Sequence, residues 1–521
     1  MKLPNLSDAV STQARLRPHQ VAVQDSITAL TYAELDLRGT KVANALLELG
    51  LREGDRVGVL AKNAAAWLEL YVALARAGLV VVPINFRLSH QEVGYILKDS
   101  GAKALLAQHT FIPLAEQAVD EKAGMHKIVL DGDKSPGWLP YTGLIDAGKA
   151  ARGGRPVPRH DVAALMYTSG TTGSPKGVIR SHQGSTLMAM ATAVEMGFTQ
   201  RDRALIVMPL CHANSLYFSH TFLHLGATCV IDDSKSFDPQ HLLRLLSSHE
   251  ITFTSLVPTH FVMLLSLPEA ITRTHDVSAV SKLMVSSAPI RKETKRQILE
   301  FFPNGQLHEL YGSTEAGWVT LLRPSEQIEH IGSIGREWAF SGPIKVLDDA
   351  KQEVPDGVVG EIFSNTAYAF DGYWRLPDKT DEAMHGAWCS VGDMGYRDPQ
   401  GYLHLVDRKS NMIISGGENI YPSEVEGVLC AHEWVQDAAV VGVPDDKWGE
   451  AVYAFVAFKG NRSMAANELS DWCATQLARF KVPRYFAFIA ADQIPRNATG
   501  KVLHRELRKR AQQHLAEGKV N

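Results

Sequence analysis

The sequence predicts an α/β protein with a large N-terminal part and a smaller α+β part at its C-terminal end. Three observations support this fold class. Helical and strand patterns alternate from the start of the chain, which is typical of βαβ units and a largely parallel sheet. After about residue 335 the pattern changes to short β-rich pieces, and from Asn411 a compact α+β unit follows.

The first predicted elements follow one another in a regular order. Thr31-Tyr-Ala-Glu34 is a capping box, which predicts the start of a helix that Gly50 ends. The next segments predict a buried strand at 55–60, a helix at 64–77 and a strand at 79–82. The same alternation predicts further strands at 204–209, 228–231 and 282–285.

The last third of the chain has shorter elements. Gly360-Glu-Ile-Phe363 and the segment 401–406 are strand-like pieces between Gly, Pro and Asp residues, which predicts a small barrel or an antiparallel sheet. Strand candidates at 438–443 and 452–458 belong to the final α+β unit. The sequence contains no internal repeat and no low-complexity segment.

Composition excludes several classes of protein. The 521 residues include 53 Lys+Arg and 57 Asp+Glu, so the net charge is −4, and 45% of residues are hydrophobic. These values are ordinary for a globular protein. A protein that mainly binds a polyanion carries a clear excess of Lys and Arg, so we expect no nucleic-acid partner.

The cysteines and the lengths of the apolar runs indicate where in the cell the protein is located. The five cysteines lie far apart and form no zinc-binding spacing, which is typical of a reduced, intracellular protein. The N-terminus lacks the apolar stretch of a signal peptide. The longest apolar run, 79–84, is far shorter than the roughly 20 residues that span a bilayer. We therefore expect no membrane span and a cytoplasmic location, and the sequence leaves a homodimer open.

The most informative segment is a loop rich in Gly, Ser and Thr. Tyr167-Thr-Ser-Gly-Thr-Thr-Gly-Ser-Pro-Lys-Gly177 follows an apolar run at 162–166. Its three glycines let backbone N–H groups turn inward, and its hydroxyls and Lys176 add donors, which suits a polyphosphate. Pro175 and the glycine after Lys176 exclude a Walker loop. An ordinary surface turn is the alternative.

Further motifs follow in an order that points to one family. They are Pro209-Leu-Cys-His212, Tyr311-Gly-Ser-Thr-Glu315, Val391-Gly-Asp393, the run from Asp407 to Glu426, and Pro495-Arg-Asn-Ala-Thr-Gly-Lys501. With the loop, they resemble the adenylate-forming superfamily of acyl-CoA synthetases, luciferases and peptide-synthetase adenylation domains. The resemblance covers nearly the whole chain. It implies an N-terminal AMP-binding domain of two βαβ-type sheets plus a small β-barrel at 1–407, a hinge at 408–410, and a small mobile α+β C-terminal domain at 411–521.

The resemblance also implies a reaction in two steps. The family joins a carboxylic acid to ATP as an acyl-adenylate with release of pyrophosphate, and then passes the acyl group to a thiol, usually CoA. Since a carboxylate and a phosphate repel each other, cations and oriented donors must offset the charge. The positions that match the family's catalytic residues are Lys501, His212, Thr314 and Glu315, with Glu315 as the ligand of Mg²⁺.

Each of these residues has a plainer interpretation. Lys501 lies next to a basic helical segment, and Glu315 follows two hydroxyl residues at a position that favours acidic side chains anyway. His212 could be a structural histidine. The resemblance assigns ATP and AMP to a larger set, in which serines at 286 and 287 stand where glycines are common: Thr168, Ser169, Gly170, Thr171, Thr172, Gly173, Lys176, Ser287, Ala288, Pro289, Tyr311, Gly312, Asp393 and Arg408.

The second step requires a path for CoA, which the family opens by rotating its C-terminal domain about the hinge, here at Ser410. By resemblance, candidates for CoA contact combine glycines, cations and aromatic rings: Arg87, Ser415, Gly416, Gly417, Trp448, Phe480 and Arg484. The aromatic ones could equally be core residues. The run at 418–424 favours a CoA ligase over a peptide-synthetase domain, and the short segment after Lys501 leads us to expect no carrier module.

The acyl pocket is assigned by resemblance to Ala213, Thr259, His260, Ala316, Gly317 and Trp318. The bulk of Trp318 favours an aromatic or medium-length acid, although a swinging wall is an alternative. Asn214 and His260 could meet a polar substituent or be satisfied by core hydrogen bonds. We predict an ATP- and Mg²⁺-dependent carboxylic acid:CoA ligase. The alternatives are a stand-alone enzyme that loads an acyl carrier protein, and a nucleotide-binding regulator without turnover.

Overall fold

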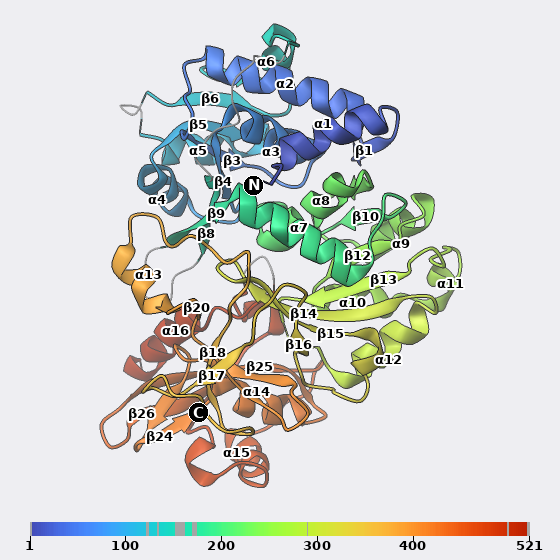
Figure 1. The fold of residues 1–521 in the computed structure, drawn as a ribbon. Helices are drawn as coiled ribbons and strands as arrows, with labels where there is room; N and C mark the ends of the chain where they lie inside the picture. Colours follow the sequence, from blue (N-terminus) through green and yellow to red (C-terminus); the bar gives the residue numbers. More distant parts are fainter. Residues whose placement is uncertain are drawn as a thin grey trace. The chain divides into compact units, whose positions relative to one another are not determined.

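A computed structural model describes residues 3–120, 124–132, 135–151, 162–168, 175–288, 290–496 and 500–517. The chain forms two compact units (Figure 1). Unit 1 comprises Met1–Ile344 and Ser364–Cys389, and unit 2 comprises Lys345–Phe363 and Ser390–Asn521. The α/β fold class is confirmed, whereas the domain boundary at 408–410 stays a prediction.

The first sheet of unit 1 has seven strands in the order β7-β6-β5-β3-β4-β8-β9. All neighbours are parallel except β8 and β9, which form an antiparallel pair. The predicted strands near 55–60 and 79–82 are β3 and β4. The strands are β3 (Arg56–Leu60), β4 (Val80–Ile84), β5 (Ala102–Ala107), β6 (His126–Val129), β7 (Leu139–Pro140), β8 (Val162–Thr168) and β9 (Lys176–Ser181).

The second sheet of unit 1 has nine strands in the order β16-β15-β14-β13-β12-β10-β11-β1-β2. Its central strands are parallel, and β2, β15 and β16 are antiparallel to their neighbours. The predicted strand at 204–209 ends earlier, at Ile206. The strands are β1 (Val21–Gln24), β2 (Ala29–Thr31), β10 (Arg203–Ile206), β11 (Thr228–Ile231), β12 (Phe253–Leu256), β13 (Lys282–Ser286), β14 (Gln306–Ser313), β15 (Gly317–Leu322) and β16 (Arg336–Glu337).

The helices of unit 1 pack on these sheets, and β19 (Met384–His385) pairs with β20 (Trp388–Cys389) beside them. The predicted capping box is present, because Thr31 and Glu34 each bond the other's backbone at the start of α2. The helices are α1 (Leu6–Leu16), α2 (Tyr32–Glu48), α3 (Ala65–Ala77), α4 (His90–Ser100), α5 (Ile112–Ala118), α6 (Tyr141–Ala147), α7 (His182–Met196), α8 (Ala213–Leu225), α9 (Pro239–Ser248), α10 (Pro258–Leu265), α11 (Glu269–Thr272), α12 (Lys292–Phe301) and α13 (Pro377–Ala383).

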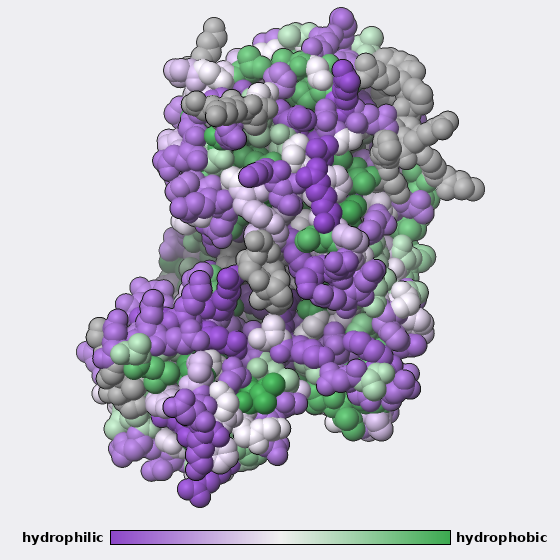
Figure 2. All heavy atoms as spheres, turned by 90° about the vertical axis from the view of Figure 1, so that its left-hand side faces the viewer, coloured by the Kyte–Doolittle hydropathy of each residue, from purple (hydrophilic) through white to green (hydrophobic). Residues whose placement is uncertain are grey.

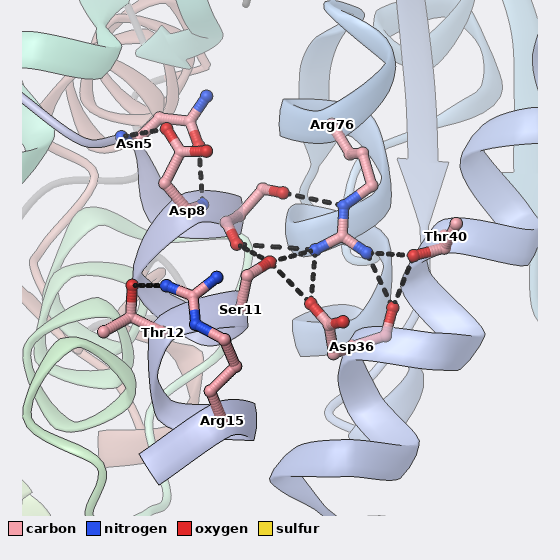
Figure 3. Close-up of polar contacts among 9 residues, drawn as sticks. Asn5, Asp8, Ser11, Thr12, Arg15, Asp36, Thr40 and Arg76 are labelled. Carbon is pink, nitrogen blue, oxygen red and sulfur yellow. Dashed lines mark hydrogen bonds and ion pairs between the residues drawn. The ribbon is translucent and has the colours of Figure 1, made fainter. Parts of the chain in front are cut away.

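A polar cluster joins the first three helices (Figure 3). The guanidinium of Arg76 on α3 donates to Asp36 Oδ1 on α2 at 2.8 Å and to Ser11 Oγ on α1 at 2.9 Å. It also donates to Ser7 Oγ at 2.8 Å. A charge between packed helices is stable only when such partners offset its desolvation. Arg76 therefore fixes α1 and α2 against α3.

Unit 2 contains two sheets. The β-rich segment forms an antiparallel sheet in the order β17-β18-β21-β22, the second of the two arrangements that the sequence left open. The other sheet runs β24-β23-β26-β25, with β27 also on β26. The elements are β17 (Lys345–Leu347), β18 (Gly360–Phe363), β21 (Asp393–Arg397), β22 (Leu403–Arg408), β23 (Ile413–Ser415), β24 (Glu418–Ile420), α14 (Pro422–Ala431), β25 (Val435–Asp445), β26 (Gly449–Phe458), α15 (Ala466–Ala474), β27 (Tyr485–Phe488) and α16 (His504–Ala516).

The long strands of unit 2 separate two hydrophobic cores. Val440 and Val456 belong to the core under α14 and α15, whereas Val441 and Phe455 belong to the core under α16. Neighbouring residues thus point to opposite faces, as strand geometry requires. On the face shown in Figure 2, hydrophilic side chains prevail and hydrophobic ones are scattered. Among the described residues, no helix has the length and apolar character needed to cross a membrane.

Candidate active site

The residues assigned to ATP begin at the β8–β9 hairpin of unit 1. Thr168 ends β8 and pairs with Lys176, the first residue of β9. The hairpin therefore brings together the two ends of the Gly-rich loop. The rest of the predicted loop set, Ser169, Gly170, Thr171, Thr172 and Gly173, lies outside the described residues, as does Pro289.

Tyr373 connects two residues of the predicted site. Its hydroxyl donates to Glu315 Oε1 at 2.9 Å, and the Lys176 Nζ lies 4.0 Å from the centroid of its ring. Glu315 is 7% exposed, so its carboxylate is fixed in a largely dry environment. One aromatic side chain thus places a cation and a carboxylate on the same part of unit 1. The sequence analysis did not single out Tyr373.

Arg180 holds the segment that carries Thr314 and Glu315. It is 1% exposed, and its guanidinium donates to the carbonyl of Thr314 at 3.2 Å and to that of Glu315 at 3.0 Å. It also donates to the Tyr217 hydroxyl on α8 at 2.9 Å. The rigid fork of an arginine suits such a set of acceptors. The available signal was a charged residue inside the buried strand β9, which the sequence analysis did not use.

The predicted adenine residues gather at the carboxyl ends of two parallel strands. Tyr311 and Gly312 lie near the end of β14, and Ser287 follows β13, which pairs with β14. A Cβ at Gly312 would lie 2.2 Å from the carbonyl oxygen of Gly317, so only glycine fits there. Ser287 has a φ of 71°, in the left-handed region. This backbone explains why glycine is common at that position in the family.

His212 lies at the start of α8, on the predicted acyl side of unit 1. Its Nε2 is buried, and no hydrogen-bond partner for it occurs among the described residues. Burial, with a smaller effect of Arg87, lowers the pKa of His212 to about 4. His260 on α10 stacks on Phe237 with ring centroids 3.9 Å apart, and burial likewise lowers its pKa to about 4. Both imidazoles are therefore neutral at pH 7.

Trp318 forms a fixed part of the same side of unit 1. It is 4% exposed, and its indole N–H donates to Thr192 Oγ1 at 3.0 Å. Its ring centroid lies 5.4 Å from that of Phe218 on α8. These contacts favour a fixed wall over a swinging one. Ala316 ends the β14–β15 turn and Gly317 begins β15, while Ala213 is the first residue of α8 and Thr259 the second of α10.

In unit 2, the predicted ribose residues are directly paired. Arg408 Nε donates to Asp393 Oδ1 at 3.0 Å, because β21 and β22 place the two residues opposite each other. Burial and, to a smaller extent, the charge of Arg408 lower the pKa of Lys501 to about 8, against the opposing effect of Asp393 and Asp407. Asp407 also accepts from the Asn411 amide at 3.0 Å. This hydrogen bond joins residues on either side of the predicted hinge residue Ser410, which is itself exposed.

Three of the predicted CoA residues come together in unit 2. The Gly416 N–H donates to the Trp448 carbonyl at 2.7 Å, and the Arg484 guanidinium lies 5.3 Å from the Trp448 ring. Ser415 and Gly417 flank Gly416. Phe480 is exposed, with the Lys481 Nζ 5.7 Å from its ring. Arg87 belongs to unit 1, where its charge acts on His212 and His260.

Comparison with known proteins identifies the family. The model of the AMP-binding enzyme family matches residues 10–374, and that of the AMP-binding enzyme C-terminal domain matches residues 424–501. This chain belongs to the AMP-binding enzyme family. Its place is in the acyl-CoA ligase branch of the adenylate-forming superfamily, as the resemblance indicated.

Relatives of the AMP-binding enzyme family match along almost the whole length. A feruloyl-CoA synthase of an Amycolatopsis species is 37% identical over 503 residues, covering 96% of this chain and 97% of the relative. A fatty acid–[acyl-carrier-protein] ligase of Streptomyces coeruleorubidus is 34% identical, covering 98% and 97%. The o-succinylbenzoate CoA synthetase of Bacillus subtilis, solved with an acyl-adenylate intermediate, has a TM-score of 0.83 and 30% identity, covering 97% and 98%.

Proposed function

We propose that this protein is an AMP-forming acyl-CoA synthetase, which joins a carboxylic acid to CoA through an acyl-adenylate and releases pyrophosphate and then AMP. The observation that carries the proposal is the charged centre of unit 2, where Lys501 has a pKa near 8 beside Arg408 and Asp393. A lysine whose charge is poorly solvated interacts strongly with an anion that reaches it. Lys501 then bridges the carboxylate and the α-phosphate.

Glu315 is the proposed ligand of Mg²⁺. Its carboxylate is buried and held by the Tyr373 hydroxyl, so a cation would meet a fixed ligand. Within the described part of the chain, no group of three or more His, Cys, Asp or Glu gathers as a metal site. This fits Mg²⁺, which commonly uses one or two carboxylates plus substrate phosphates. The bound ion supplies charge neutralisation at the phosphates, and a solved relative contains ATP with a magnesium ion.

The remaining residues divide between the nucleotide and CoA. Lys176 and the Gly-rich loop hold the phosphates, Tyr311 packs on adenine, and Asp393 accepts the ribose hydroxyls. Gly416, Trp448 and Arg484 form a contact for CoA, because a glycine admits close approach and a cation suits phosphate. Rotation at Ser410 separates the two steps. The acid is aromatic or of medium length, and a homodimer stays a prediction.

The decisive experiment follows both steps with one purified protein. Pyrophosphate release that depends on the acid, followed by AMP and thioester only after CoA is added, is the expected result. The relative that acylates a carrier protein makes carrier loading the second candidate. Acylation of a carrier protein without any CoA thioester would establish that candidate instead. Nucleotide binding without pyrophosphate release for any acid would leave only a regulator.

A further inference from the structure

Four buried polar atoms on the acyl side of unit 1 have no partner among the described residues: His212 Nε2, His260 Nδ1, Asn214 Oδ1 and Ser255 Oγ. Core hydrogen bonding was one explanation for Asn214, and it accounts for only half of the amide. Buried polar atoms in native proteins are nearly always paired, and each exception needs a reason. Asn214 and Ser255 line the same space, so their two unpaired atoms point to a group that the protein itself does not supply.

Only one end of the Asn214 amide is paired. Its Nδ2 donates to Ser286 Oγ at 2.9 Å, which leaves Oδ1 as a free acceptor. Ser255 lies on β12 and is 6% exposed. A contrasting hydroxyl lies close by, because Ser215 Oγ donates to the Met208 carbonyl at 2.6 Å. The same part of unit 1 thus provides an acceptor for the Ser215 hydroxyl and none for the Ser255 hydroxyl.

Both atoms belong to residues that line one narrow space. Asn214 and Ser255 share it with Ser215 and with apolar residues of β10, of the segment just after it, of α8 and of β12, namely Leu205, Ile206, Val207, Phe218 and Phe253. In Figure 1 these elements are neighbours in unit 1. The space is too narrow for a water molecule in this structure, so water does not pair the two atoms there. In this structure, therefore, neither the protein nor water pairs the two atoms.

We propose that this space receives the end of the acyl group remote from its carboxylate, and that the preferred acid carries a hydroxyl at that end. The hydroxyl donates to Asn214 Oδ1 and accepts from Ser255 Oγ, while the apolar walls contact the carbon skeleton. Asn214 lies one residue beyond Ala213 and two beyond His212, so the space adjoins the predicted acid site. This inference rests on the proposed function.

The first test compares matched acids on the wild-type protein. Three pairs differ only by the terminal hydroxyl: benzoate and 4-hydroxybenzoate, cinnamate and 4-hydroxycinnamate, octanoate and 8-hydroxyoctanoate. We expect kcat/KM for acid-dependent pyrophosphate release to favour the hydroxylated member about 10- to 100-fold in the pair of matching length, since the plain acid leaves both atoms unpaired. The favoured pair also distinguishes a ring from a chain.

The outcomes separate the inference from the function. Pyrophosphate release with equal kcat/KM inside every pair, or a preference for the plain acid, overturns the hydroxyl and leaves the proposed function intact. No pyrophosphate release with any acid overturns the function, and the inference falls with it.

The second test moves the preference with single substitutions. Asn214→Leu and Ser255→Ala each remove one polar atom, so the ratio of kcat/KM within the favoured pair should fall toward 1. Ser215→Ala is the matched control on the same wall, because its hydroxyl already has a partner, and it should keep the wild-type ratio. A thermal melt checks folding of each variant. If Asn214→Leu does not fold, Ser255→Ala decides, and an unchanged ratio in that folded variant overturns the proposal.

Discussion

The residues assigned to the nucleotide, here called the nucleotide side, differ from the residues on the acyl side of unit 1 around His212, Asn214 and His260, here called the acyl wall. The two sets differ in how their polar groups are paired. Among the residues assigned to the nucleotide, Glu315 in unit 1 is bonded to Tyr373, and Asp393 in unit 2 is bonded to Arg408. On the acyl wall, His212 Nε2 and Asn214 Oδ1 are buried and lack partners among the described residues. The first set is organised by the protein itself. We expect the second set to be completed by the bound acid.

This difference fits what each side must do. Every reaction of such an enzyme uses the same nucleotide, so dipoles and charges fixed before binding cost no reorganisation when charge develops. The acid is what a ligase must discriminate, and unpaired buried groups discriminate strongly because a wrong ligand leaves them unpaired. The expectation is that substitutions on the nucleotide side lower rates for all acids, whereas those on the acyl wall change the ranking of acids.

The largest effect is expected at Lys501. Lys501→Ala should lower adenylate formation by about 10³-fold, as expected for loss of a group that stabilises developing charge. Transfer from preformed acyl-adenylate to CoA should stay largely intact, because rotation at the hinge removes Lys501 from that step. Each half-reaction is measured separately, by pyrophosphate release and by thioester formation. Equal loss of both halves would contradict the rotation.

The pKa of Lys501 gives the same prediction a second readout. Since this pKa is about 8, adenylation by the wild type should decline as pH rises through 8 and the ammonium loses its proton. Lys501→Arg keeps its charge at every accessible pH, so whatever activity it retains should show no decline near pH 8. If the adenylation rates of the wild type and of Lys501→Arg declined with the same pH midpoint, the titrating group would be one other than Lys501.

The acyl wall should respond to acid through its neutral histidines. His260 has a folded-state pKa near 4 and an ordinary value of 6.5, so unfolding takes up a proton between these pH values. Stability is therefore lost as pH falls through this window, by about 1.4 kcal/mol per pH unit for each such histidine. Urea unfolding between pH 7 and 4.5 measures the slope.

A single substitution isolates this contribution. His260→Phe keeps a flat ring that can stack on Phe237 and removes the titrating group. The pH slope of its unfolding free energy should be shallower than that of the wild type by about 1.4 kcal/mol per pH unit below pH 6.5. Parallel curves for the two proteins would mean that His260 is protonated as easily in the folded chain as in the unfolded one.

A smaller effect is expected on the nucleotide side at Tyr373. Tyr373→Phe keeps the ring under Lys176 and removes the hydrogen bond to Glu315, worth about 1 kcal/mol. The apparent affinity for Mg²⁺ in adenylation should weaken several-fold for every acid alike. Tyr71→Phe is the control, because its buried hydroxyl bonds the Leu210 carbonyl instead and should leave Mg²⁺ dependence unchanged. A changed ranking of acids in Tyr373→Phe would break the division between the two sides.

Sequence patterns predicted the fold class because each helix or strand signal depends on residues that are close together in the chain. The capping box at Thr31 and the buried strand at β3 depend on residues within one turn or one pleat. The family could likewise be recognised from its motifs, because each motif is a short run of neighbouring residues. The sequence did not show to which unit the small β-rich segment belongs. Strands β17 and β21 share a sheet because both pair with β18, and β18 and β21 pair through residues far apart in the chain.

The parts of the site that patterns missed are partners rather than motif members. Arg180 and Tyr373 act on Glu315 from segments that lie about 60 to 140 residues away along the chain. Ser255 is one hydroxyl in a buried strand, and only three-dimensional packing reveals that it lacks a bond. Sequence alone could not separate it from Ser215, whose hydroxyl is satisfied.

The smallest expected effect concerns Ser287, which joins the two sides because its neighbour Ser286 anchors Asn214. At a φ of 71°, a side chain with a Cβ costs roughly 1–2 kcal/mol, whereas glycine pays about 0.5–1 kcal/mol of extra entropy in the unfolded state. Ser287→Gly should therefore stabilise the protein by up to about 1 kcal/mol, seen as a small rise in Tm, and should leave the ranking of acids unchanged. Ser287→Val, with a branched Cβ at the same φ, should lower Tm, and a rise in both variants would show that backbone strain is not the cause.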